Sequence, residues 1–218
     1  MKRQTVSLCM IARDEESRIG TALKSVLALV DEVVVVDTGS SDNTRIIAEG
    51  YGARVVDAAW SDDFAAARNV GLGEVTSDWV LVLDADEYLQ PTRPVEFQRL
   101  LHDPTAAGYR LRIISPREEA GPEGRVQCRL FRADPQVRYR FPIHEQVSPA
   151  VETFAAAEGL HVYDTLLSVV HEGNEAERRT RSRERALRIL RKAVDSHPHE
   201  AYFPYRLGCE GQIRLDDE

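Results

Sequence analysis

Two short, almost uninterrupted apolar runs constrain the fold of this chain more than any other feature. Val33–Val36 consists of four valines. Trp79–Leu83 consists of a tryptophan followed by alternating valines and leucines, with no charged side chain. Strands that are apolar on both faces are typical of a parallel sheet that is covered by helices on each side. Between these runs lie a segment with helix-forming character and a further strand-like run, Arg54–Asp57. The alternation predicts an α/β fold.

The first half of the chain repeats this alternation without a break. Strands are predicted over Val6–Ile11, Val33–Val36, Arg54–Asp57 and Trp79–Leu83, with helices over about Glu16–Leu29, up to Gly50, and over about Phe64–Gly71. The order predicts a doubly wound, mostly parallel sheet. Functional sites of such sheets lie at the carboxyl ends of the strands, so polar residues that directly follow a strand are the first candidates for a site.

The second half is less regular and ends in helices. Strands are predicted over Tyr109–Ile114, Gln127–Phe131 and Leu167–Val170, with a mobile loop over Pro116–Gly124. The composition then becomes rich in Arg and Glu, which predicts an amphipathic helix over Glu175–Ser196 and a second helix over Glu200–Leu215 after His197-Pro198. We therefore expect an α/β domain over residues 1–174 and a helical extension over residues 175–218 that could contact a protein partner.

Charge and composition argue against nucleic-acid-binding, zinc-binding and membrane-spanning proteins. The formal net charge of −8 argues against a nucleic-acid polymer as partner. The three cysteines have no zinc-binding spacing, and no apolar run approaches the roughly 18 residues of a membrane span. The N-terminus lacks the features of a signal peptide, so we expect a cytoplasmic protein.

The strongest chemical signal is Asp84-Ala85-Asp86, which directly follows an apolar strand. Carboxylates at a strand end can converge on one hard cation, which in turn can stabilise a departing diphosphate. A turn that caps the next helix is the alternative for such a pair in isolation. The position after the fourth strand of an α/β pattern favours the metal interpretation.

Two further polar groups follow predicted strands. Asp37 ends the Val33–Val36 strand, where a carboxylate can accept a hydrogen bond from a base or a ribose, or can cap the Thr38-Gly39-Ser40 turn. Ala12-Arg13-Asp14-Glu15 follows the first strand, as a nucleotide-binding edge or as a charged helix start. No dinucleotide fingerprint, phosphate-binding lysine loop or serine elbow accompanies them, which argues against dehydrogenases, P-loop enzymes and hydrolases.

Four blocks in the expected order resemble the family 2 glycosyltransferases. They are Ser7–Glu16, Glu32–Thr44, Phe64–Asn69 and Leu83–Glu87, and the similarity covers about residues 5 to 175. More narrowly, the chain is similar to the bacterial branch in which tetratricopeptide-like helices follow the catalytic domain. The resemblance implies a GT-A fold, a nucleotide-diphosphate sugar donor, Mn²⁺ or Mg²⁺, and inversion at the anomeric carbon.

The resemblance also implies roles for individual residues. Ala12, Arg13 and Glu15 would line the nucleoside pocket, Asp37 would hold the base, most often uracil, Asp84 would lie near the ribose, and Asp86 would bind the metal. Arg68 would face the nucleotide or diphosphate, with a structural salt bridge to Asp62 or Asp63 as the alternative. The donor would then be a UDP-sugar and the acceptor an unidentified hydroxyl.

The acceptor half of the site rests on two further matches. Glu145, in the Ile143-His144-Glu145 block, is the candidate for the base that takes the acceptor's proton, with Asp134 and Glu172 as the next candidates. His171 matches a position where related GT-A enzymes place a metal-binding histidine, and a structural histidine is the alternative.

Two other functions remain open at this point. A nucleotidyltransferase that makes nucleotide sugars would also use an α/β sheet, acidic residues and a metal, but the Ala12–Glu16 segment lacks the glycine-rich loop typical of that class. A non-catalytic scaffold could recruit a partner through the helical extension. The presence of the candidate site residues Asp84, Asp86 and Asp37 argues against this function.

Overall fold

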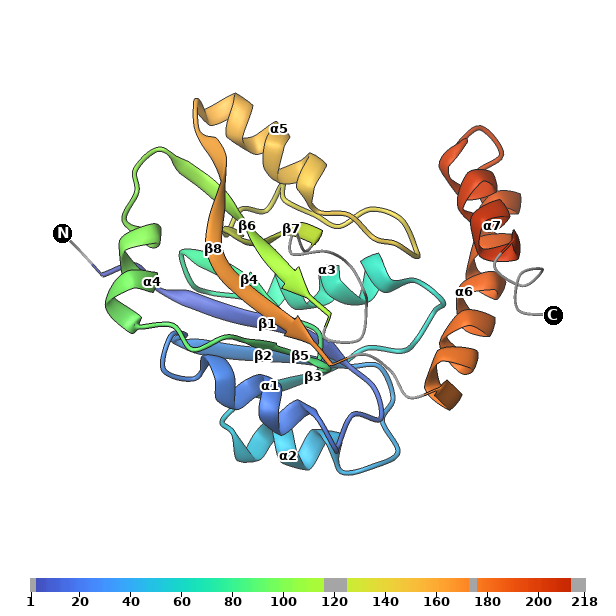
Figure 1. Ribbon diagram of the computed structural model, residues 1–218, viewed down its shortest axis with the longest axis horizontal. Helices are drawn as coiled ribbons and strands as arrows, with labels where there is room; N and C mark the ends of the chain where they lie inside the picture. The colour runs from blue at the N-terminus through green and yellow to red at the C-terminus, as the bar shows by residue number, and fades with distance from the viewer. Residues whose placement is uncertain (1–2, 116–124, 173–175, 213–218) are drawn as a thin grey trace.

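The computed structural model describes residues 3–115, 125–172 and 176–212. Its centre is an eight-stranded sheet in the order β3-β2-β1-β4-β7-β6-β8-β5. The strands are β1 (Val6–Ala12), β2 (Glu32–Asp37), β3 (Arg54–Asp57), β4 (Trp79–Val82), β5 (Glu87–Leu89), β6 (Ala106–Ile114), β7 (Arg125–Arg132) and β8 (His161–His171). Helices lie on both faces of the sheet, and the C-terminal helical pair stands beyond one end of its strands (Figure 1).

The four N-terminal strands form the parallel half that the apolar runs predict. β1 pairs in parallel with both β2 and β4, and the register sets Ala12 opposite Asp37. Alternate side chains of β1 point to opposite faces of the sheet. Met10 packs in the hydrophobic core on one face, and Cys9 packs in the core on the other face. Both faces are therefore closed to water, as an all-apolar strand requires.

The remaining strands make the sheet mixed. β7 runs antiparallel to β4 and β6, β8 runs parallel to β6, and β5 runs antiparallel to the end of β8. Four of the seven neighbouring pairs are parallel, so the predicted fold class is confirmed. The antiparallel β7 brings its N-terminal residues to the edge where β1, β2, β4 and β8 end.

Five helices cover the sheet. α1 (Ile19–Val26), α2 (Thr44–Gly50) and α4 (Pro94–Leu101) pack on one face, while α3 (Phe64–Glu74) and α5 (Ser148–Glu158) pack on the other. α3 approaches β1 closely at Gly71, where an added Cβ would lie 2.6 Å from the Cys9 sulfur. The glycine is needed here because it lets helix and strand come into direct contact.

Several boundaries differ from the sequence-based prediction. α1 begins at Ile19 rather than Glu16, because the amides of Arg18 and Ile19 both bond to the Glu15 carbonyl in a tight turn. β8 is longer than Leu167–Val170, and β5, α4 and α5 were not predicted. β5 has only three residues, too few to show a period. The predicted loop Pro116–Gly124 lies outside the described residues.

The helical extension consists of α6 (Ala176–Ser196) and α7 (Tyr202–Gln212). The predicted boundary at residues 174–175 and the predicted helix end at Leu215 both lie outside the described residues. Ile189, Leu190 and Phe203 are buried together with Ile143 of the preceding domain, and Trp60 and Phe64 pack against them. The extension thus shares a small hydrophobic core with the α/β domain.

None of the helices in the described ranges combines the length and apolar character that crossing a membrane demands. All three cysteines are free thiols, and Cys9 and Cys128 are buried.

Candidate active site

A cleft of about 1130 Å³ opens at the sheet edge where β1, β2, β4 and β8 end. This volume slightly exceeds the usual range for small-molecule sites, about 300–1,000 Å³. Its lining includes Ala12, Arg13 and Glu15 after β1, Asp84 and Asp86 after β4, and His171 at the end of β8. Arg68 of α3, Glu145 and several residues of α6 complete it. Eight of the nine predicted site residues therefore lie around one cavity.

The ninth, Asp37, ends β2 but is not among the cleft-lining residues. It is buried, and its Oδ1 accepts hydrogen bonds from the backbone N–H groups of Gly39 at 3.0 Å and Ser40 at 2.8 Å. Gly39 has φ 101°, a conformation that favours glycine. The carboxylate thus caps the turn after β2, and the neighbouring Thr38 faces the cleft instead.

The loops after β1 and β2 are tied together at the cleft wall. The Glu15 amide donates to the Thr44 hydroxyl at 2.7 Å, and the Ser41 amide donates to Asp14 at 2.7 Å. Asp14 has φ 53°, so the chain turns sharply directly after β1. These contacts explain why the Arg13–Glu16 and Ser40–Thr44 segments carry polar side chains. They give this wall of the cleft a defined shape.

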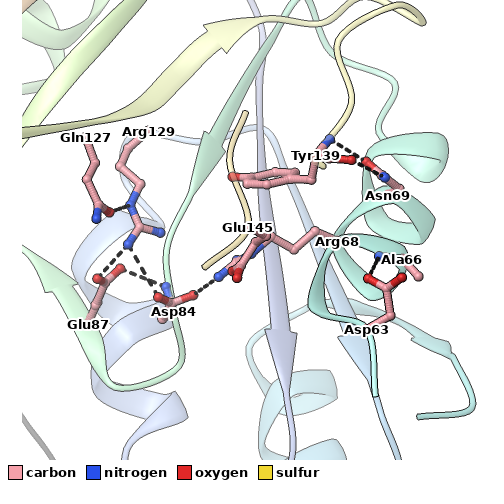
Figure 2. A network of polar contacts seen from close by, with 10 residues as sticks. All are labelled: Asp63, Ala66, Arg68, Asn69, Asp84, Glu87, Gln127, Arg129, Tyr139 and Glu145. Atoms are coloured by element: carbon pink, nitrogen blue, oxygen red, sulfur yellow. Dashed lines mark hydrogen bonds and ion pairs between the residues drawn. The ribbon is translucent and has the colours of Figure 1, made fainter. Parts of the chain in front are cut away.

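The buried Arg68 lies at the centre of a polar network whose carboxylates Asp84 and Glu145 are partly exposed (Figure 2). Its Nε donates to Glu145 Oε1 and its Nη2 donates to Asp84 Oδ1, each at 2.7 Å. The guanidinium carbon stands 5.3 Å from the Tyr139 ring centre. Nη1 is buried and has no hydrogen-bond partner among the described residues. Neither Asp62 nor Asp63 holds Arg68: Asp63 caps α3 through the Ala66 amide, and Asp62 pairs with Arg188.

Arg129 of β7 holds the turn after β4 from the other side. Its Nη2 lies 2.8 Å from Glu87 Oε1 and 3.4 Å from Asp84 Oδ2 (Figure 2). Burial alone would raise the pKa of the Asp84 carboxyl, but Arg68 and Arg129 hold that pKa well below its usual value. Burial raises the pKa of Glu87, with Arg129 opposing the rise and Asp84 adding to it. Asp84 is therefore an ionised anchor between two arginines.

Asp86 points to a different set of partners. Antiparallel pairing places Glu87 of β5 opposite His171 of β8, so the preceding Asp86 meets the histidine ring. His171 Nε2 lies 3.2 Å from Asp86 Oδ2, and Arg18 Nη1 lies 3.8 Å from the same oxygen. The hydrogen bond to Asp86 raises the pKa of His171, although burial opposes the rise. Among the described residues, the side-chain ion pairs of Asp84 and Asp86 thus go to different partners.

Glu145 sits on the loop between β7 and α5. Phe141 and His144 have φ values of 75° and 51°, so this loop is tightly bent on both sides of Ile143. Phe141 stacks on Tyr202 of α7, and Ile143 lies in the small core of the extension. The bend and these contacts direct Glu145 inward to Arg68. Of the alternative bases, Glu172 follows the cleft-lining His171 but is not itself among the lining residues. Asp134 lies beside the start of β4 and does not line the cleft either.

Sequence reasoning missed Arg129, Tyr139 and Asn69. Arg129 lies in a strand whose direction the sequence does not reveal, and no local pattern marks it. Asn69 belongs to a block that the family resemblance highlighted, and its amide bonds both backbone groups of Tyr139, at 2.9 and 2.8 Å. This clamp holds the tyrosine ring near Arg68 (Figure 2).

Known proteins share both the sequence pattern and the fold. The model of the family described as "Glycosyl transferase family 2" matches residues 7–158. A protein of Synechococcus elongatus named as TPR repeat-containing is 37% identical over 210 residues, which cover 93% of this chain and 51% of that protein. The chain therefore spans about half the length of this relative.

Two solved structures show how far the fold is shared. A mannosyltransferase of Pyrobaculum calidifontis, in complex with GDP-Man and Mn²⁺, has a TM-score of 0.62 and 17% identity over 97% of this chain and 74% of its own. Glucosyl-3-phosphoglycerate synthase of Mycobacterium tuberculosis, with Mn²⁺, UDP and phosphoglyceric acid, has a TM-score of 0.57 and 18% identity over 81% of this chain and 74% of its own. The β-sheet order, the cleft at the carboxyl edge and the family match lead to one conclusion: this chain belongs to glycosyl transferase family 2.

Proposed function

We propose that this chain is a metal-dependent, inverting glycosyltransferase that moves a sugar from a UDP-sugar to an acceptor hydroxyl. The observation that carries the proposal is the meeting of the Asp86–His171 pair with Arg68 in one cleft. A diphosphate suits this arrangement, because it can accept hydrogen bonds from a guanidinium and share a cation with a carboxylate.

The donor atoms of Asp86 and His171 fit a divalent metal. A carboxylate oxygen and an imidazole nitrogen suit Mn²⁺, and Mg²⁺ sites often use one or two protein ligands plus phosphate oxygens and water. Among the described residues, no group of three or more His, Cys, Asp or Glu side chains forms a metal cluster. The remaining ligands would therefore come from the diphosphate and water, and the metal would offset the charge that develops on the leaving group.

Arg68 is suited to bind the donor diphosphate. A buried N–H without a partner costs about 1–3 kcal/mol, which a phosphate oxygen would offset. Asp84 and Glu145 fix the other two nitrogens, so the guanidinium cannot turn away from the cleft. Its positive charge is in place before the sugar bond breaks, as electrostatic preorganisation requires.

Glu145 is the residue that we propose as general base. Its side chain is 15% exposed and lines the cleft. An acceptor hydroxyl that attacks the anomeric carbon from the side opposite the diphosphate has to lose its proton to such a group. Glu145 also forms an ion pair with Arg68. Protonation of Glu145 would weaken that ion pair as negative charge develops on the leaving diphosphate, which Arg68 would stabilise.

Donor hydrolysis provides the first test. We expect the purified chain with Mn²⁺ to release UDP slowly from at least one UDP-sugar, with water as acceptor, and EDTA to abolish the release. GDP-mannose serves as the parallel donor, because the Pyrobaculum neighbour binds it. Absence of both nucleotide binding and nucleotide release across these donors would refute the enzymatic proposal and favour a scaffold.

A further inference from the structure

α6 forms one wall of the cleft rather than a separate appendage. Ser182, Arg183, Arg185, Ala186 and Arg188 all line the cavity. One turn further on, Ile189 and Leu190 are fully buried against the α/β domain. Because residues three and four apart share a helix face, this packing fixes the side on which Arg185 is presented.

Arg185 differs from the other arginines of the site in its contacts. Its guanidinium carbon lies 5.1 Å from the Phe64 ring centre, and Nη2 is 3.5 Å from the Ser182 hydroxyl, at the outer limit of a hydrogen bond. Within the described ranges, no carboxylate lies within ion-pair distance of it. By contrast, Arg188 meets Asp62 at 2.8 Å. Arg185 is thus a half-buried cation without an anionic partner in the part of the chain that the structure describes.

The surrounding charges make this position unfavourable unless an anion is bound. Burial lowers the pKa of Arg185, and the neighbouring charges of Arg13 and Arg188 lower it further, while Glu15 and Asp62 act in the opposite direction. Among the described residues, Arg13 forms one loose ion pair, with Asp14 at 3.8 Å. A guanidinium that faces a cleft and has no carboxylate partner among the described residues is suited to bind a phosphate-type anion.

We propose that Arg185, assisted by Arg13 and Arg188, binds a phosphate-type oxyanion between α6 and the domain edge. The oxyanion belongs either to the diphosphate of the donor or to an anionic acceptor. The assignment deepens the proposed glycosyltransferase function, and in the first case it rests on that function. In both cases α6 is part of the substrate site, and the aromatic face of Phe64 holds the guanidinium in place.

Binding measurements with Arg185→Gln separate the two sources of the anion. Arg191→Gln is the matched control, because Arg191 is exposed on the same helix and does not line the cleft. The probes are UDP, uridine and inorganic phosphate, titrated calorimetrically into each variant after circular dichroism has shown that its fold is intact. A lost charge-assisted hydrogen bond lowers affinity by about tenfold or more.

If the anion is the donor diphosphate, Arg185→Gln weakens UDP at least about tenfold and leaves uridine unchanged. If it belongs to the acceptor, UDP binding is unchanged and phosphate binding to the UDP-saturated protein is lost. Unchanged UDP and phosphate binding in Arg185→Gln would overturn the proposal. A wild-type chain that binds no nucleotide would refute the glycosyltransferase proposal alone, because the phosphate titration of the nucleotide-free protein still tests Arg185.

A folding defect in Arg185→Gln does not remove the test. Arg185→Lys keeps the charge and the long side chain, so we expect it to retain part of the affinity. In the wild type, the arginine Nε–H resonances can be followed by NMR during the phosphate titration, with Arg185→Lys identifying the signal of Arg185. A resonance that does not move at saturating phosphate and UDP would contradict the assignment.

Discussion

Replacement of Glu145 by Gln tests whether this residue is a base or only an anchor for Arg68. Its Oε1 lies 2.7 Å from Arg68 Nε, and the two side chains are 15% and 8% exposed. Breaking a buried ion pair costs about 3–5 kcal/mol when the remaining charge is left alone. Here Arg68 keeps Asp84 at 2.7 Å, and the Gln oxygen still accepts a hydrogen bond. We therefore expect a loss of only about 1–2 kcal/mol in the free energy of unfolding.

The effect on activity should be much larger than the effect on stability. An amide cannot take up the acceptor proton, so transfer should fall roughly 10²- to 10⁴-fold. UDP affinity and slow donor hydrolysis should persist, because Arg68 and the metal ligands are unchanged. The expected signature is an uncoupling of donor hydrolysis from glycosyl transfer.

Three measurements on Glu145→Gln decide between the roles: UDP affinity by calorimetry, UDP release with water, and transfer to an acceptor that the wild type glycosylates. Glu158→Gln, exposed on α5 and remote from the cleft, is the control. Normal transfer would refute Glu145 as the base and move that role to Glu172. A parallel loss of UDP affinity would instead assign Glu145 to the positioning of Arg68.

Four further predictions concern the metal, the base pocket, packing and thiol reactivity. Asp86→Ala should remove the metal dependence of UDP binding and lower kcat, and full activity of this variant in EDTA would contradict the metal site. Asp37→Asn tests the predicted base contact: the amide oxygen can still accept from the Gly39 and Ser40 N–H groups, so the Tm should change little, while UDP binding should weaken by roughly 1.5–3 kcal/mol; unchanged affinity with a lower Tm would leave Asp37 as a turn cap only. Gly71→Ala should destabilise the fold by about 1–3 kcal/mol in urea unfolding, because its Cβ would lie 2.6 Å from the Cys9 sulfur, and Cys9→Ala should relieve part of that loss. Burial raises the pKa of Cys9 to about 12, so a thiolate-specific reagent at pH 8 should label partly exposed Cys209 and spare Cys9 until urea unfolds the chain.

The sequence alone determined the parallel half of the fold and the sheet end at which most of the predicted site residues lie. Val33–Val36 and Trp79–Leu83 are apolar on both faces, and such runs are stable only inside a covered sheet. Once their parallel direction is known, Ala12, Asp37 and Asp84 have to lie at one edge, because each follows a strand of the same orientation. Local pattern therefore sufficed for residues whose place depends on the strand that precedes them.

Tertiary structure decided which of these groups touch. The short β5 pairs antiparallel with the end of β8, and only that register brings His171 to Asp86 across 85 positions of sequence. Arg129 reaches Asp84 because β7 runs against β4, a direction that no local periodicity encodes. The same holds for Arg185, whose helix reaches the cleft through a hydrophobic contact with Ile143. Hydrophobic spacing specifies which face of an element is buried, but the partner of that face depends on chain-wide packing, and at this site the packing sets the distances between charges.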